Sequence, residues 1–125
     1  MFHRVIIVGN LGGDPTMRYT NDGTPVTTLS VATNEGSGDK KHTIWWRVSV
    51  WHKQAEVCNQ YLTKGSKVLV EGAMQADRAT GGPRLWDGND GKPRASFEIT
   101  AREVKFLSSK GESHDAPASE DDLPF

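Results

Sequence analysis

Apolar and polar residues alternate in short runs along residues 1–107, and clusters of Gly, Asn, Asp and Pro separate the runs. Alternation with a period of two is typical of strands that bury one face. β-Branched and aromatic residues fill these runs, which favours strands over helices. Strands are therefore predicted for 3–8, 26–33, 43–51, 67–77 and 94–107, with a shorter one over 17–20.

One segment follows a helical period instead. In residues 54–64, Ala55, Cys58 and Leu62 recur at i, i+3 and i+7, which places them on one face of a helix. Gly65 stands where a C-capping glycine is expected. The Gly/Pro-rich stretch 80–93 is too polar for a core element and is predicted to form the tip of a long hairpin.

Five antiparallel strands with one helix between the third and the fourth are the element order of an OB-fold, a partly open Greek-key barrel. A parallel α/β sheet would need several helices between its strands. The sequence therefore predicts an all-β protein, with a five-stranded OB-fold domain over 1–107 and a short tail over 108–125.

The strand 43–51 carries large aromatic side chains on both faces. Trp46 shares one face with aliphatic residues and is predicted to face the core, whereas Trp45, Arg47 and Trp51 share the other. A tryptophan exposes a large apolar area to water unless something covers it. Unpaired bases stacked on the rings would do so, and so would a second sheet or subunit; the pattern leaves both open.

A fourth tryptophan, Trp86, lies in the polar stretch 80–93, where few apolar neighbours are available to bury it. It is predicted either to offer a stacking surface at the hairpin tip or to fold back on the barrel. Aromatic rings interleaved with positive charge are typical of proteins that bind single-stranded nucleic acid. The basic residues around Trp86 are Arg78, Arg84, Lys92 and Arg94.

The formal net charge of −1 conceals an uneven distribution. Residues 108–125 hold five acidic residues and one lysine, while the rest of the chain holds 14 basic and 11 acidic residues. This composition predicts a disordered acidic tail after a mildly basic domain. The apolar residues at its end either enter a partner's pocket or have no role. The tip consists of Asp121, Asp122, Leu123, Pro124 and Phe125.

The sequence carries no motif for catalysis or cofactor binding. It has no dinucleotide fingerprint and no phosphate-binding loop, and its four histidines lack metal-ligand spacing. Cys58 is the single cysteine, which excludes a disulfide within the chain. No paired carboxylates or activated nucleophile stand out. We therefore expect a binding protein with no enzymatic activity, no cofactor and no metal. The apolar run 5–8 is far too short to cross a bilayer, so the expected location is the cytoplasm.

Four segments together resemble the bacterial single-stranded DNA-binding proteins of replication and repair. They are 8–15 (VGNLGGDP), 45–51 (WWRVSVW), 61–72 (YLTKGSKVLVEG) and 121–125 (DDLPF). The resemblance implies an OB-fold that assembles as a homotetramer. It also implies sequence-independent binding and protection of single-stranded DNA during replication, recombination and repair, in the cytoplasm and at the nucleoid. The tip corresponds to the peptide by which such proteins recruit replication and repair enzymes.

The resemblance also assigns roles to particular residues. Trp45, Trp51 and Trp86 correspond to the base-stacking positions of the family. Its basic DNA-contacting positions are occupied by Arg4, Arg18, Arg47, Lys53 and Lys64, and Arg84 is added as a neighbour of Trp86. Two other function classes are weighed: an OB-fold accessory protein of the primosome type, which acts mainly through protein contacts, and a small nuclease or nucleotide hydrolase.

The chain departs from the family pattern in three places. The loop 34–42 is short and lacks a tryptophan that many members have, so one stacking surface fewer is expected. The linker 108–119 is also short, which limits how far the tip reaches from the domain. Leu123 stands where isoleucine is common.

Overall fold

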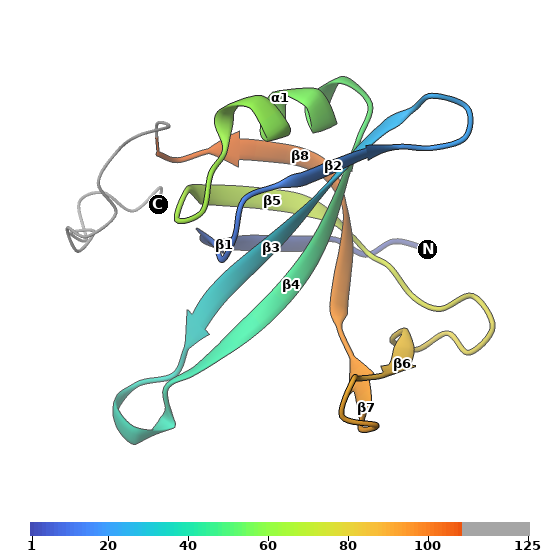
Figure 1. Cartoon of the computed structure of the whole chain (residues 1–125). Helices are drawn as coiled ribbons and strands as arrows, with labels where there is room; N and C mark the ends of the chain where they lie inside the picture. The colour runs from blue at the N-terminus through green and yellow to red at the C-terminus, as the bar shows by residue number, and fades with distance from the viewer. Residues whose placement is uncertain (109–125) are drawn as a thin grey trace.

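The structure, a computed structural model, describes residues 1–108 of the chain. Strands make up most of this part (Figure 1). The predicted tail and its tip, 109–125, lie outside the described residues. The strands are β1 (Val5–Leu11), β2 (Thr16–Tyr19), β3 (Pro25–Glu35), β4 (His42–Trp51), β5 (Lys67–Met74), β6 (Leu85–Asp87), β7 (Pro93–Ala95) and β8 (Phe97–Phe106), and the helical segments are η1 (Gly38–Lys40) and α1 (Lys53–Tyr61).

Five of these strands close into a barrel. They follow the order β1-β5-β8-β4-β3, and β3 returns to β1 through the pairs Asn10↔Ala32 and Leu11↔Val31. The short strand β2 is added to β3 at the outside of the closure. This arrangement is the OB-fold that the element order predicts, with α1 between β4 and β5.

One pairing corrects the sequence-based expectation of an all-antiparallel barrel. β4 and β8 run parallel, with Trp46 opposite Phe97 and Arg47 opposite Glu98, whereas every other pairing within residues 1–108 is antiparallel. Parallel neighbours need a long crossover between them. Here α1, β5 and the β6–β7 hairpin together provide it.

The helix lies where the sequence predicts it, but it ends before the predicted residue 64. It ends at Tyr61, and the C-cap residue Leu62 already has extended backbone. Gly65 is therefore not a helix cap. It occupies a following turn with φ of 92°, and the Ser66 N–H closes that turn on the Thr63 carbonyl. Glycine adopts this left-handed conformation without the penalty that a Cβ brings.

The predicted closing strand 94–107 is interrupted at Ser96. The part before the break, β7, pairs with β6 in a two-stranded sheet of its own. The part after it, β8, joins the barrel. The stretch 80–93 is thus a hairpin as predicted, but it already contains β6. The predicted strand 67–77 also stops earlier, at Met74.

Aliphatic side chains from all five barrel strands fill the interior, and α1 covers one end. The helix contributes Ala55 and Cys58, and Leu62 follows directly after it; all three are buried as their spacing predicts. Burial raises the pKa of the Cys58 thiol to about 11 by desolvating the thiolate. The thiol therefore stays protonated at neutral pH and acts as a small apolar group. The remaining core residues are mainly Leu29, Val31, Val48, Val50, Val68, Val70 and Ile99.

Residues 1–108 show neither a cluster of metal ligands nor a helix that could span a membrane. No group of three or more His, Cys, Asp or Glu residues in 1–108 is arranged to hold a metal ion. No helix in the same range is long and apolar enough to span a membrane.

Backbone strain is concentrated at His52, the residue between β4 and α1. His52 has φ of 63° and ψ of −141°, a conformation that is costly for a residue with a Cβ. The turn is fixed from both sides, because the His52 N–H donates to the Pro25 carbonyl and its own carbonyl accepts from Ala55. The imidazole is exposed and makes no capping hydrogen bond.

Replacing His52 with glycine should therefore stabilise the protein. Relief of the strained φ outweighs the extra freedom of glycine in the unfolded chain, so His52→Gly should raise the free energy of unfolding by about 1 kcal/mol. Urea unfolding at an unchanged m-value measures this. The matched control is His42→Gly, since His42 is exposed at the start of β4 and has no left-handed φ. An equal loss of stability in both variants would contradict the assignment of strain.

Candidate nucleic-acid interface

Strand register places the predicted contact residues on one outer face of the barrel. Along β4, Trp45 lies opposite Ala32, Arg47 opposite Ser30 and Trp51 opposite Val26. Side chains of directly paired residues point to the same side of a sheet. The face therefore continues across β3 to β2 and, through the pair Arg47↔Glu98, to β8. The indoles of Trp45 and Trp51 are 52% and 37% exposed, so neither is sealed in the interior.

Trp46 points to the opposite side, as the alternation predicts, but the core covers it only in part. Its ring packs against the buried cluster, and its Nε1–H donates to the Thr33 hydroxyl at 2.9 Å. Phe97 lies beside it, with ring centroids 5.5 Å apart and planes tilted by 41°. The two rings sit at the start of the β4–β8 pairing, and Phe97 remains exposed.

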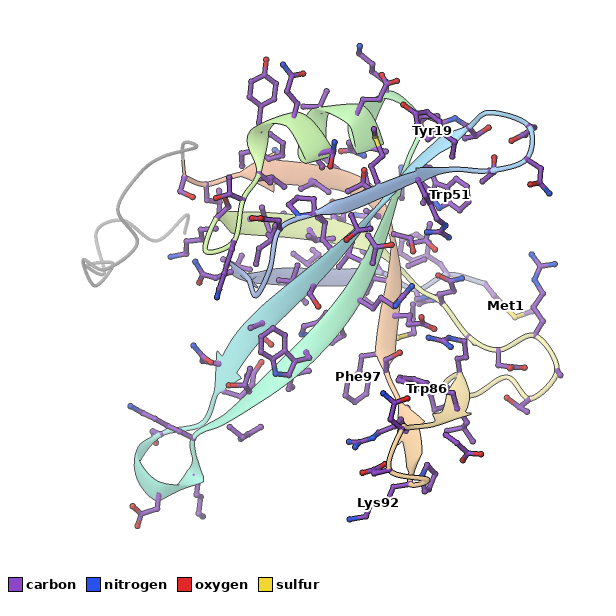
Figure 2. All side chains as sticks on the ribbon, viewed as in Figure 1. Met1, Tyr19, Trp51, Trp86, Lys92 and Phe97 are labelled. Carbon is purple, nitrogen blue, oxygen red and sulfur yellow. The ribbon has the colours of Figure 1, made fainter. Side chains whose placement is uncertain are left out.

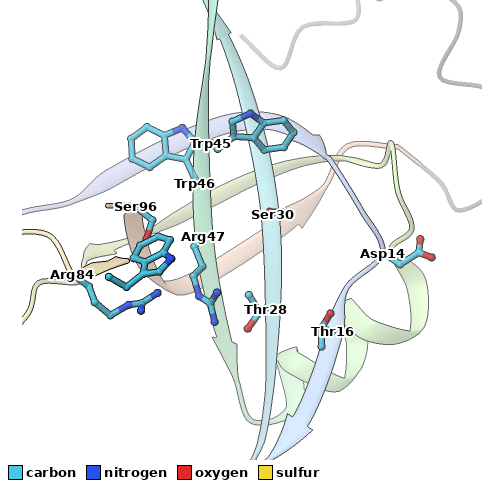
Figure 3. Close-up of a pocket in the computed structure, with 10 residues that line it drawn as sticks. Asp14, Thr16, Thr28, Ser30, Trp45, Trp46, Arg47, Arg84 and Ser96 are labelled. Carbon is cyan, nitrogen blue, oxygen red and sulfur yellow. The ribbon is translucent and has the colours of Figure 1, made fainter. Parts of the chain in front are cut away.

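A groove of about 420 Å³ runs over the outer face (Figure 3). One side of it carries aromatic and basic side chains: Trp45 and Arg47 from β4, with Arg84 and Trp86 from the β6 region. Trp46, whose side chain turns to the other face of β4, also borders the groove. The structure thus brings together four predicted site residues, Trp45, Arg47, Arg84 and Trp86, from segments about 40 positions apart in the sequence.

Small hydroxyl side chains form the other side of the groove. Thr16 on β2 and Thr28 and Ser30 on β3 lie there, with Asp14 at the end. These residues leave room above the sheet and offer hydrogen-bonding groups. The groove can therefore hold a planar ring against its aromatic side while polar atoms of the same ligand face the hydroxyls.

A single carboxylate organises the positive charge of the groove. Glu98, whose side chain is 11% exposed, lies 3.5 Å from Nε of Arg47 through Oε1 and 3.4 Å from Nε of Arg84 through Oε2. Both guanidinium groups point toward the same part of the groove (Figure 3). The three groups together keep one positive charge.

Arg84 also links the charge to the aromatic surface. Its guanidinium carbon lies 4.6 Å from the centre of the Trp86 ring, within the range of a cation–π contact. Trp86, 39% exposed, is therefore neither at a free hairpin tip nor buried under the barrel. It is held at the edge of the groove through Arg84 and Glu98.

Trp51 lies in a second, shallower hollow at the other end of the face (Figure 2). The turn between β2 and β3 and His52 form the rest of this hollow of about 530 Å³. Six residues separate Trp51 from Trp45 along β4, which corresponds to about 20 Å. Hydrogen bonds from Thr20 and then Thr24 lower the pKa of Asp22 in the turn, so this carboxylate is ionised near Trp51.

The other predicted basic residues lie outside both hollows. Arg4 pairs with Glu71 at 3.3 Å, and Lys53 pairs with Glu56 at 3.6 Å on the first turn of α1. Exposed pairs of this kind contribute at most about 1 kcal/mol, so they leave both charges available to a polyanion. Arg18 and Lys64 are exposed and have no ion pair within residues 1–108; Arg18 lies on β2 across β3 from Trp51.

Comparison with known proteins decides the family. The profile described as "Single-strand binding protein family" matches residues 2–107. The chain belongs to this family. A relative from Xylella fastidiosa named "Single-stranded DNA-binding protein 1" is 37% identical over 96% of this chain and 94% of its own length. Relatives named "Single-stranded DNA-binding protein" from Neisseria meningitidis and Xanthomonas campestris are 37% and 38% identical over 89% and 88% of this chain, which spans 63% of their length.

Sequence reasoning missed several residues of this family member's groove. Glu98 and the hydroxyl side of the groove become visible only when β8 and β2 are placed beside β4 and β3. The alternation of 26–33 does place Thr28 and Ser30 on the face opposite Leu29 and Val31, which was the available signal. For Glu98 no local signal exists, because its partners are 51 and 14 positions away.

Gly12 is a further residue that the pattern did not single out. The Cζ3–Cη2 edge of the Trp45 ring lies against it, so a Cβ at Gly12 would approach Cη2 of Trp45 to 2.6 Å and Cζ3 still more closely. The Gly12 N–H donates to the Ser30 carbonyl at 2.9 Å, which fixes the backbone beneath the ring. Gly12 therefore lets the edge of the indole approach the backbone, and a side chain at this position would push the ring away.

The substitution Gly12→Ala should displace the Trp45 indole. Overpacking at this contact should lower the free energy of unfolding by about 1 kcal/mol, and most of that cost should vanish when Trp45 is already alanine. A double-mutant cycle in urea measures the coupling. Gly13→Ala is the matched control, because Gly13 has an ordinary φ and nothing within 4 Å of the added Cβ. If Gly12→Ala lowered the free energy of unfolding equally in the unaltered protein and in the Trp45→Ala variant, this role of Gly12 would be contradicted.

Proposed function

We propose that the protein binds single-stranded DNA with little sequence preference and protects it during replication, recombination and repair. Membership of the single-strand binding protein family supports the binding of single-stranded DNA. The observation that carries the proposal for these residues is the groove in which exposed Trp45 and Trp86 face two arginines. Its role is binding, and no covalent step is assigned to it.

Stacking on the tryptophans provides the base contacts. Each base has a π-face, so a ring such as Trp45 accepts any base, and one stacked base contributes about 1–3 kcal/mol. A base in a duplex already uses both faces for stacking within the helix. The groove therefore favours unpaired strands, and it needs no contact with base edges to do so.

The arginines provide the phosphate contacts. Arg47 and Arg84 share Glu98, and the net charge left over attracts the backbone of the strand. Phosphates can reach the arginines, because both guanidinium side chains are nearly half exposed while they share one acid. Arg18, near Trp51, extends the positive charge toward the second hollow. Affinity should fall with salt at a log–log slope of about −0.7 per phosphate contacted.

Assembly and location belong to the same proposal. The protein works as a homotetramer in the cytoplasm, at the nucleoid where single strands are exposed. Exposed apolar side chains away from the groove support assembly: Phe2 is 78% exposed before β1, and Ile6 on β1 is 59% exposed. Exposed apolar residues that together form a patch often mark a contact with another subunit.

The domain over 1–107 and the tail over 108–125 have separate tasks in this proposal. The domain holds DNA, and the tip from Asp121 to Phe125 recruits replication and repair enzymes. A terminal phenylalanine beside acidic residues suits an apolar pocket with a basic rim on the partner.

Single and paired tryptophan substitutions test the DNA-binding face. Trp45→Ala, Trp51→Ala and Trp86→Ala should each weaken binding of a dT oligonucleotide by about 1–3 kcal/mol. Trp45 and Trp51 lie far apart, so their losses should add, whereas Trp45 and Trp86 share the groove and should not be additive. Titrations followed by anisotropy of a labelled oligonucleotide measure the affinities of the unaltered protein, the three single variants and the two double variants.

Tyr61→Ala serves as the control for these titrations, since Tyr61 is 49% exposed on α1 and lies outside both hollows. It should bind dT as the unaltered protein does. A duplex of equal length should bind much more weakly than dT. Equal affinity for the two would remove the stacking mechanism.

Deletion of Leu123 to Phe125 tests the division of labour. The truncated chain should bind dT with unchanged affinity, because every residue of the groove lies in the domain. It should lose the ability to retain repair enzymes in a pull-down that the full chain supports. Loss of DNA binding with an intact circular dichroism spectrum would show that the tail belongs to the DNA site. Retention of all partners would leave the tip without its proposed role.

A further inference from the structure

Phe97 is a large exposed aromatic residue that the groove does not contain. It begins β8, and 53% of its surface is exposed. The last residue of β5, Met74, pairs with Ile99, so β5 does not reach as far as Phe97. The contact with Trp46 covers part of the ring, and about half of the residue remains exposed.

A separate hollow of about 250 Å³ lies against Phe97. Met74 and Ala76 at the end of β5 and Pro83 from the following loop provide its other apolar walls. Gly81 and Gly82 line it through backbone alone, which keeps that side open and flat. The hollow is therefore a slot with an aromatic ring on one wall and a proline on another.

The slot is continuous with the groove. Ser96, in the break between β7 and β8, lines both of them. Pro83 lines the slot and the next residue, Arg84, lines the groove. A chain that leaves the groove past Trp86 therefore passes Ser96 and reaches Phe97 directly. Figure 2 shows Phe97 and Trp86 at the same end of the molecule.

We propose that this slot is a further base-binding subsite of the same single strand, with Phe97 as its stacking ring. The inference rests on the proposed function and extends it. The volume of the slot, about 250 Å³, suits one planar ring. Its position beside Arg84 supplies positive charge for the phosphate that joins this base to the groove. An aromatic wall next to positive charge is the combination that single strands occupy.

Substitutions of Phe97 combined with two oligonucleotide lengths test the subsite. Phe97→Leu keeps apolar contact with Trp46 and removes the π-face. It should weaken binding of dT of about 16 nucleotides by about five- to 150-fold and leave dT of about four nucleotides unaffected. Phe97→Tyr should restore the affinity. Phe106→Leu, at the far end of β8 and 37% exposed, is the matched control and should bind as the unaltered protein does.

A direct contact is tested by photocrosslinking. A dT oligonucleotide of about 16 nucleotides with one 5-iodouracil should crosslink to Phe97 from one internal position, as peptide mass spectrometry of the ultraviolet-irradiated complex identifies. Absence of that crosslink, with crosslinks to Trp45 or Trp86 present, would overturn the subsite.

The outcomes separate this inference from the proposed function. If the unaltered protein does not bind dT, the function itself fails. If it binds, and Trp45→Ala weakens binding while Phe97→Leu does not, only the subsite fails. Equal weakening of short and long oligonucleotides by Phe97→Leu would mean that Phe97 merely supports Trp46. A changed mass in solution with unchanged affinity would assign Phe97 to a subunit contact. Either of the last two results overturns the proposal.

Discussion

The parallel pairing of β4 with β8 is the constraint on which the site depends. It sets Trp46 opposite Phe97 and Arg47 opposite Glu98, and so it joins the tryptophan strand to the strand that follows the β6–β7 hairpin. A shift of one residue in this register would turn Glu98 to the core side and remove the carboxylate from both arginines. The same strand pairing therefore helps to close the barrel and brings the residues of the groove together.

The three tryptophan rings on the DNA-binding face are partly exposed, yet each of them contacts a neighbouring residue or turn. Trp45, Trp51 and Trp86 keep between a third and about half of their surface in water, which is unfavourable for large apolar rings. Each ring nevertheless has a close neighbour: Gly12 at the edge of Trp45, the turn between β2 and β3 beside Trp51, and Arg84 over Trp86. Rings held in place on one side bind with less loss of side-chain freedom.

Local patterns predicted the parts of the structure that local physics decides. The period of two in 43–51 placed Trp45, Arg47 and Trp51 on the outer face, and the helical stripe through Cys58 was buried as expected. The end of the helix was wrong, because Leu62 leaves the helix to extend toward the turn at Gly65, and helix termini depend on tertiary contacts.

Contacts between distant segments were beyond such reasoning. The parallel partner of β4, the shared Glu98 and the exposed position of Phe97 all follow from how strands associate, not from spacing along the chain. Gly12 is similar, since nothing in its neighbours reveals that an indole 33 positions later will lie on it. The family resemblance assigned roles to the tryptophans and basic residues but to none of these three, whose contacts only the structure reveals.

The break at Ser96 has a mechanical consequence for Trp86. Because β6 and β7 form a sheet of their own, no backbone ladder ties the Trp86 ring to the barrel. The Arg84–Glu98 ion pair instead holds the hairpin side of the groove against the barrel, and its carboxylate is only 11% exposed. The width of the groove at Trp86 therefore depends on side-chain contacts and not on backbone pairing.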